Sequence, residues 1–184
     1  LVCLSRLVSD ILLVFLSWCC VILDHPSPLR RLRQMFISYR LFALPCLGSP
    51  TVNSCRRLWD TGFWAPVYAD WGFQNRTTAL RISAPGRFEY RSVDSAVNPY
   101  LSFAGLLKAM EDGLDRNLDP GPPAERNIYE AMEEGKEVKK IPMHPGEALD
   151  ALRADEVIKS ALPNELFQVF QHYQRAERDP TLPP

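Results

Sequence analysis

The feature that most constrains the fold is a run of alternating charged and less polar residues from Arg87 to Val93. A period of two places successive side chains on opposite faces of a β-strand. Two β-prone stretches precede this run, residues 66–71 and 77–82, and a Pro85-Gly86 pair typical of a turn separates it from the second. The sequence therefore predicts three strands, with a hairpin between the last two.

Helical signals dominate after residue 97. Asn98 is a favourable N-cap, Pro99 suits the first helical position, and apolar residues then recur on one helical face to about Asn117. Residues 119–124 are rich in proline and predict an exposed loop. Further helices are expected at about 127–134, 145–154, 155–160 and 164–177. Antiparallel strands followed by helices predict an α+β domain.

Composition divides the chain near residue 65. Residues 1–65 contain no lysine and no glutamate, and they hold all five cysteines. We predict an atypical apolar, Cys/Arg-rich segment over residues 1–64, with the composition of an upstream region read from an unselected frame, and one domain over residues 65–184. The domain lacks cysteine, which suits the cytoplasm. A net charge of −1 gives no field to attract nucleic acid, so we expect no nucleic-acid partner.

An apolar run from Ile11 to Leu23 is the only sequence feature that suggests a membrane. Asp10 and Asp24 bound it, which leaves about 13 residues, whereas a spanning helix needs about 20. We therefore do not expect this run to cross a bilayer, although membrane association through it stays open.

The residues most suited to chemistry lie between positions 75 and 91. Arg87, Glu89 and Arg91 share one face of the predicted strand, and the hairpin would bring Arg81 beside them. Guanidinium groups bind phosphate and carboxylate oxygens, and a carboxylate is a hard ligand for Mg²⁺ or Mn²⁺. Arg76 can join this site only if its segment begins in a loop. The alternative is a solvated strand face held by cross-strand ion pairs.

Three tryptophans lie close to this segment, namely Trp59, Trp64 and Trp71. We expect them to pack against the sheet. Aromatic rings beside arginines can also stack a nucleotide base, which is the alternative.

Four short motifs in order carry a resemblance to a known family: Asn75-Arg76-Thr77, Arg81-Ile82, Arg87-Phe88-Glu89-Tyr90-Arg91 and Asn98-Pro99-Tyr100. Together they resemble the Asn-Arg-Ser/Thr, Arg-Ile/Val-Pro, Arg-x-Glu-x-Arg and Asn-Pro-Tyr series of the glutamine synthetase family. The resemblance covers residues 65 to about 178 and implies the C-terminal portion of the catalytic domain. Ser83 stands where the family usually has proline.

The resemblance implies a role for each charged residue. Arg76 would contact the transferred phosphoryl group, Arg81 and Arg87 the phosphates of ATP, and Arg91 the carboxylate of glutamate, while Glu89 would be a ligand of Mg²⁺ or Mn²⁺. Such enzymes condense glutamate with ammonia through γ-glutamyl phosphate, with ATP as the phosphoryl donor, and they assemble into homo-oligomeric rings.

Other ligands that the family uses for its metals, mainly upstream glutamates, are missing from residues 1–65. We therefore expect an incomplete copy that does not make glutamine by itself. The short arm between Arg81 and Arg87 suggests a second possibility, a γ-glutamyl ligase for another amine such as methylamine, a polyamine or ethanolamine. A third is a remnant without turnover that binds nucleotide or docks on intact subunits.

Overall fold

The computed structural model describes residues 40–49, 51–58, 64–84, 87–119, 121–135 and 137–178. Three strands form one sheet in the order β1 (Tyr68–Phe73), β2 (Thr78–Ala84) and β3 (Arg87–Tyr90). All three lie where the sequence predicts them. The predicted turn at residues 85–86 and the apolar run at residues 11–23 lie outside the described residues. No helix in the described ranges is long and apolar enough to cross a membrane.

The strands pair in two different ways. β2 and β3 are antiparallel, as predicted, and Arg81 lies opposite Glu89. β1 and β2 instead run parallel, with Phe73 opposite Ile82, so the expected antiparallel arrangement is wrong for this pair. A parallel pair ordinarily needs a crossover of a dozen or more residues. Here residues 74–77 suffice, because they fold back alongside β1 as a tight loop held by hydrogen bonds of Asn75.

Helix α5 (Pro99–Asp115) follows the sheet and confirms the longest helix predicted near residue 98. The side chain of Asn98 accepts hydrogen bonds from the backbone N–H groups of Tyr100 and Leu101 at 3.0 and 3.4 Å. Asn117 has a φ of 48°, a left-handed conformation that asparagine tolerates and that stops the helix. The start and the end of α5 are thus both set by local side chains.

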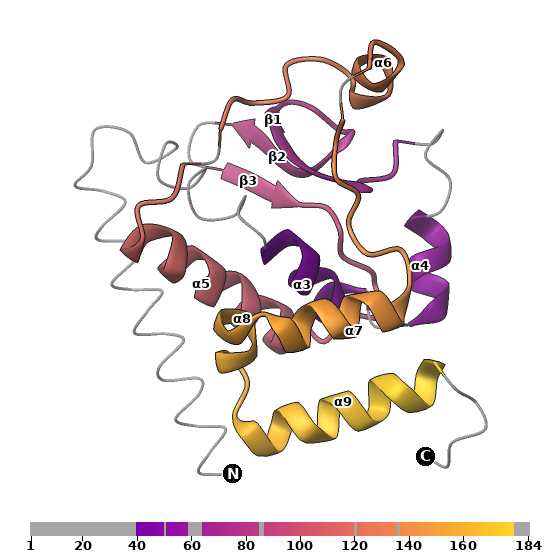
Figure 1. Cartoon of the computed structure of the whole chain (residues 1–184), viewed down its shortest axis with the longest axis vertical. Coiled ribbons are helices and arrows are strands. Elements are labelled where there is room, and N and C mark those ends of the chain that lie inside the picture. Colours follow the sequence, from indigo (N-terminus) through magenta and orange to yellow (C-terminus); the bar gives the residue numbers. More distant parts are fainter. Residues whose placement is uncertain are drawn as a thin grey trace.

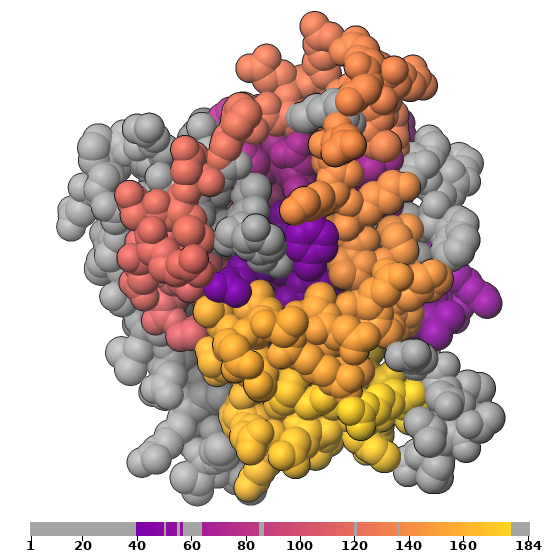
Figure 2. Space-filling model, viewed as in Figure 1, coloured from indigo at the N-terminus to yellow at the C-terminus, as the bar shows by residue number. Residues whose placement is uncertain are grey.

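The remaining described helices are α3 (Arg40–Gly48), α4 (Val52–Leu58), α6 (Ile128–Glu133), α7 (Pro145–Ala154), α8 (Glu156–Ser160) and α9 (Asn164–Arg178). The last four confirm the short and terminal helices predicted from the sequence. Helix α3 packs against α5 and α7 below the sheet, and α9 lies on the far side of α7 (Figure 1). In the space-filling view, α7, α8 and α9 cover the lower part of the face of the molecule that is turned toward the viewer, while α6 projects at the top (Figure 2).

The main core forms where the sheet meets these helices. Its fully buried side chains come from α3, the strands, α5, α7 and α8, and include Leu44, Trp71, Leu80, Leu152 and Ile158. Helix α3 therefore packs in the same core as the strands, although it precedes residue 65.

Trp71 confirms the expected packing against the sheet. Trp64 does not, because it is 51% exposed, and Trp59 lies outside the described residues.

Candidate functional site

The β2–β3 hairpin separates an apolar face from a charged one. Phe88 and Tyr90 pack against the main core. The alternate positions carry Arg87 and Glu89, and Glu89 lies directly opposite Arg81. The two-residue period of the sequence therefore predicts the charged face correctly.

Arg81 is more enclosed than its neighbours Glu89 and Arg87 on this face. Its Nη1 lies 3.0 Å from Glu89 Oε2, with side chains 16% and 36% exposed, and its Nη2 donates to Gln74 Oε1 at 2.5 Å. Its Nε is buried and has no hydrogen-bond partner among the described residues. A buried N–H without a partner is costly, so the enclosed position of Arg81 carries an energetic penalty.

Arg87 lies at the outer end of the hairpin. Its Nε donates to Ser83 Oγ at 2.9 Å, and its Nη2 lies 4.0 Å from Glu89 Oε1. The side chain remains 70% exposed, so its guanidinium can reach a ligand. Ser83, the departure from the family's usual proline, therefore supplies a hydroxyl that orients Arg87.

Arg91 and Arg76 meet at the opposite end. The backbone N–H of Arg91 donates to Ala79 O at 2.9 Å, which continues the pairing beyond β3. Its guanidinium donates to the carbonyl oxygens of Arg76 and Trp64. Burial lowers the pKa of Arg91, Arg81 and Arg76 lower it further, and Glu89 opposes them. Arg91 is thus held close to two other cations.

Arg76 lies in the fold-back loop before β2 and is exposed. This is the condition under which it and Arg81 can serve one site, and the structure fulfils it. Arg81 and Arg87 therefore lie beside Glu89, while Arg91 binds the backbone of Arg76 at the other end of the hairpin, so that four arginines and one glutamate occupy the hairpin and its adjoining loop. Such an excess of guanidinium groups suits phosphate or carboxylate ligands.

The same residues do not form a metal site. Within the described ranges no three His, Cys, Asp or Glu side chains come together. Glu89 faces Arg81 and Arg87 instead of other carboxylates. Because Mg²⁺ and Mn²⁺ need several oxygen ligands, the described residues alone do not fit the family's metal cluster.

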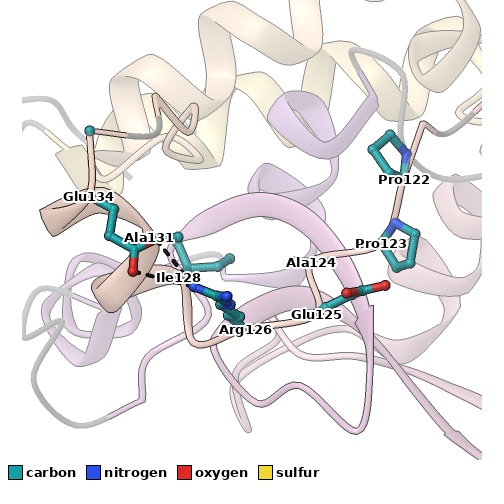
Figure 3. Close-up of a pocket in the computed structure, with 9 residues that line it drawn as sticks. Pro122, Pro123, Ala124, Glu125, Arg126, Ile128, Ala131 and Glu134 are labelled. Atoms are coloured by element: carbon teal, nitrogen blue, oxygen red, sulfur yellow. Dashed lines mark hydrogen bonds and ion pairs between the residues drawn. The ribbon is translucent and has the colours of Figure 1, made fainter.

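A cavity of about 680 Å³ lies along residues 122–135 (Figure 3). Arg126 and Glu134 form an ion pair beside it at 3.3 Å, and none of the predicted site residues lines it. Sequence analysis missed this cavity, because the proline-rich stretch indicated only an exposed loop. A second, apolar cavity of about 420 Å³ lies between β3 and α5.

The fold and this hairpin define an α+β domain that carries a group of arginines on two adjacent strands and the loop before them. The model of the family "Glutamine synthetase, catalytic domain" matches residues 38–181, so the chain belongs to the glutamine synthetase catalytic-domain family. The match begins upstream of residue 65, the point at which the sequence resemblance begins, and it includes α3. The resemblance drawn from the four motifs is therefore confirmed.

Several glutamine synthetases are similar to this chain. That of Pyrococcus abyssi is 41% identical over 143 residues, which cover 73% of this chain and 32% of the relative. That of Thermotoga maritima is 41% identical over 144 residues, with coverages of 74% and 32%. That of Methanocaldococcus jannaschii is 35% identical over 169 residues, with coverages of 85% and 37%. The chain thus spans about a third of the length of the curated relatives it matches.

Two solved structures are similar to this chain in fold and in sequence. A structure described as "GmaS/ADP complex-Conformation 1" superposes with a TM-score of 0.72 at 32% identity, covering 81% of this chain and 35% of that one. A "novel glutamine synthase homolog" gives a TM-score of 0.62 at 28% identity, with coverages of 83% and 34%.

Proposed function

We propose that this chain supplies the phosphate- and glutamate-binding arginines of a glutamine synthetase-type ligase. In this proposal Arg76 contacts the transferred phosphoryl group, Arg81 and Arg87 bind ATP phosphates, and Arg91 binds the carboxylate of glutamate. Glu89 is the one metal ligand that this hairpin contributes. The intact assembly would be a homo-oligomeric ring in the cytoplasm.

The proposed reaction has two steps. The γ-carboxylate of glutamate attacks the γ-phosphorus of ATP, which releases ADP and forms γ-glutamyl phosphate. Ammonia then attacks the γ-carbonyl carbon, phosphate leaves, and glutamine forms. Negative charge spreads over the phosphoryl oxygens as the first bond forms, and fixed guanidinium groups stabilise that charge without having to reorganise.

One observation carries the proposal, namely that the hairpin and its adjoining loop hold four arginines, Arg76, Arg81, Arg87 and Arg91, with Glu89 as their carboxylate. Arg87, which is 70% exposed, and Arg76, which is also exposed, can be reached by a ligand. Cross-strand pairing alone would need about as many carboxylates as arginines. The excess of cations therefore favours anion binding over a solvated face of ion pairs.

Nucleotide binding provides the first test. We expect the purified chain to bind ATP in titration calorimetry, and Arg76→Gln to weaken that binding about tenfold, because it removes one charge-assisted contact. Arg116→Gln is the matched control, since Arg116 is also exposed but lies just after α5. Equal losses in both variants, or no binding by the unaltered chain, would contradict the proposal.

Turnover is expected to be absent in the chain alone. The described residues provide Glu89 but no metal cluster around it, so we propose that the chain without other subunits forms no γ-glutamyl hydroxamate from glutamate, ATP and hydroxylamine. The assay is run with Mg²⁺ and with Mn²⁺. Clear metal-dependent product would show that the remaining ligands are present in the chain after all.

Glu89 itself gives a further prediction. In metal-free buffer, Glu89→Gln should tighten ATP binding by up to about fivefold, because a carboxylate partly exposed beside the phosphates no longer repels them. Glu111→Gln, on the exposed side of α5, serves as control and should leave the affinity unchanged. Calorimetry at low ionic strength measures both. Weaker binding by Glu89→Gln would mean that the carboxylate mainly holds Arg81 in place.

A γ-glutamyl ligase for another amine remains the second candidate. It is favoured by the short connection between Ala84 and Arg87, which leaves two residues between β2 and β3. Ammonia, methylamine, a polyamine and ethanolamine tested as acceptors on a full-length relative would distinguish the two ligases. A remnant that only binds nucleotide or docks on intact subunits would bind ATP, or co-purify with a full-length synthetase, without producing either product.

A further inference from the structure

The fold-back loop is bound to a segment far away in the sequence. Asn75 is 9% exposed, and its Nδ2 donates to Ala124 O at 3.0 Å and to Arg126 O at 2.8 Å. Its Oδ1 accepts from the backbone N–H of Thr77 at 2.9 Å and from Thr77 Oγ1 at 2.6 Å. The amide thus uses both donors and both acceptor sites.

Thr77 and β1 also bind this distant segment, residues 124–128. The hydroxyl of Thr77 is fully buried and accepts from the backbone N–H of Ile128 at 3.1 Å. Trp71 O accepts from the backbone N–H of Ala124 at 2.8 Å. A Cβ at Gly72 would lie 2.6 Å from Ala124 O, so only glycine permits this approach. Residues 124–128 therefore pack tightly against residues 71–77.

Arg76 lies between Asn75 and Thr77, the two residues that bind the fold-back loop to residues 124–128. Asn75 and Thr77 are buried and fully hydrogen-bonded, whereas Arg76 is exposed. Its backbone cannot shift without breaking bonds to residues 124–128, and its carbonyl oxygen also accepts from Arg91. Figure 3 shows Ala124, Arg126 and Ile128 following one another along the stretch of chain that forms the other half of this connection.

We propose that Asn75 is a positioning residue, which fixes Arg76 for phosphate by tying the fold-back loop to residues 124–128. The inference rests on the proposed function, because it concerns the same phosphate site. It gives residues 124–128 an indirect role in phosphate binding, through their hydrogen bonds to Asn75. Without the four bonds of the Asn75 amide, the loop could adopt other conformations, and only a fraction of the molecules would present Arg76 correctly.

A double-mutant cycle tests this inference. Asn75→Ala adds no charge, and we expect it to weaken ATP binding about tenfold. In a chain that already carries Arg76→Gln, the same change should cost less than about twofold, because its effect passes through Arg76. An equal factor in both backgrounds would overturn the inference. Asn98→Ala, which removes the cap of α5, is the control for destabilisation alone and should leave the affinity unchanged.

Thr77 offers a second, independent variant. Thr77→Ser keeps the hydroxyl and should bind ATP like the unaltered chain, whereas the isosteric Thr77→Val should weaken binding several-fold. Weakening by Thr77→Ser with no weakening by Thr77→Val would mean that the methyl packing, and not the hydrogen bond, matters, and the inference would fail. Thermal unfolding of each variant verifies that it is folded.

Amide hydrogen exchange separates this inference from the proposed function. If the unaltered chain binds no ATP, the proposed function fails, yet exchange still measures the connection without a ligand. Asn75→Ala should then accelerate exchange in residues 74–77 and 124–128 about tenfold or more, while α9 keeps its protection. Unchanged exchange in these two segments would overturn the inference as well.

Discussion

Replacing Arg40 by methionine is expected to lower the free energy of unfolding by about 3–5 kcal/mol. The guanidinium lies 3.0 Å from Asp112 of α5 and 2.5 Å from Asp155, and all three side chains are at most 12% exposed. Burial opposes the charge on Arg40, but the hydrogen bonds that Arg40 donates to Asp155 and Asp112, together with their negative charges, outweigh it and raise its pKa. Methionine fills a similar volume and leaves two enclosed carboxylates without their cation.

Arg116→Met is the matched control for this prediction. Arg116 approaches the same Asp112 at 3.7 Å but is 58% exposed, so its loss should cost at most about 0.5 kcal/mol. Urea denaturation followed by circular dichroism measures both variants. A cost below about 1 kcal/mol for Arg40→Met would show that water or neighbouring groups compensate the carboxylates.

Trp71→Ala is expected to cost about 3–5 kcal/mol, through the apolar area lost and the cavity left behind. The indole is 1% exposed and lies in the main core between the sheet and the helices. Its ring also meets Phe73 edge to face, with 5.7 Å between centroids.

Phe73→Ala removes the other ring of this pair and serves as control. Phe73 is 46% exposed, so its loss should cost no more than about 1.5 kcal/mol, mostly the aromatic contact. Thermal and urea unfolding give both values. Equal costs would mean that the contact between the rings, and not burial of the indole, determines the stability of this region.

The parts of the fold that the sequence predicts are those with local causes. The alternation from Arg87 to Val93 places Glu89 opposite Arg81 because a strand has a period of two. Helix α5 begins where Asn98 caps it. The charged face of the hairpin follows from the same local pattern, so the placement of Arg81 and Arg87 beside Glu89 could be anticipated before any tertiary contact was known.

Helix α3 could not be predicted in the same way. Seven of its nine residues, Leu41 and Ala43–Gly48, are buried, and a helix enclosed on all sides has no polar face to reveal its period. It also contains Pro45, which normally argues against a helix. Its position in the core depends on α5 and α7, which are remote in the sequence.

The parallel pairing of β1 and β2 could not be predicted either, because it also depends on residues that are remote in the sequence. It depends on the fold-back loop, and that loop is held by carbonyl groups 49 and 51 residues away from Asn75. The motif Asn75-Arg76-Thr77 identifies the family but contains nothing that points to residues 124–128. Only the tertiary structure shows that its two flanking residues face inward.

The position of β3 at the outer edge of the described sheet affects how the chain behaves in solution. β3 is four residues long and pairs with β2 alone among the described strands. Short length and charged side chains are the means by which natural proteins discourage such strands from pairing with another molecule. Arg87 and Glu89 are charged residues of this kind, so we expect them to limit self-association of the chain in addition to their place in the candidate site. We expect neutral substitutions at these two positions to weaken that protection. The oligomeric state of each such variant should therefore be measured together with its affinity.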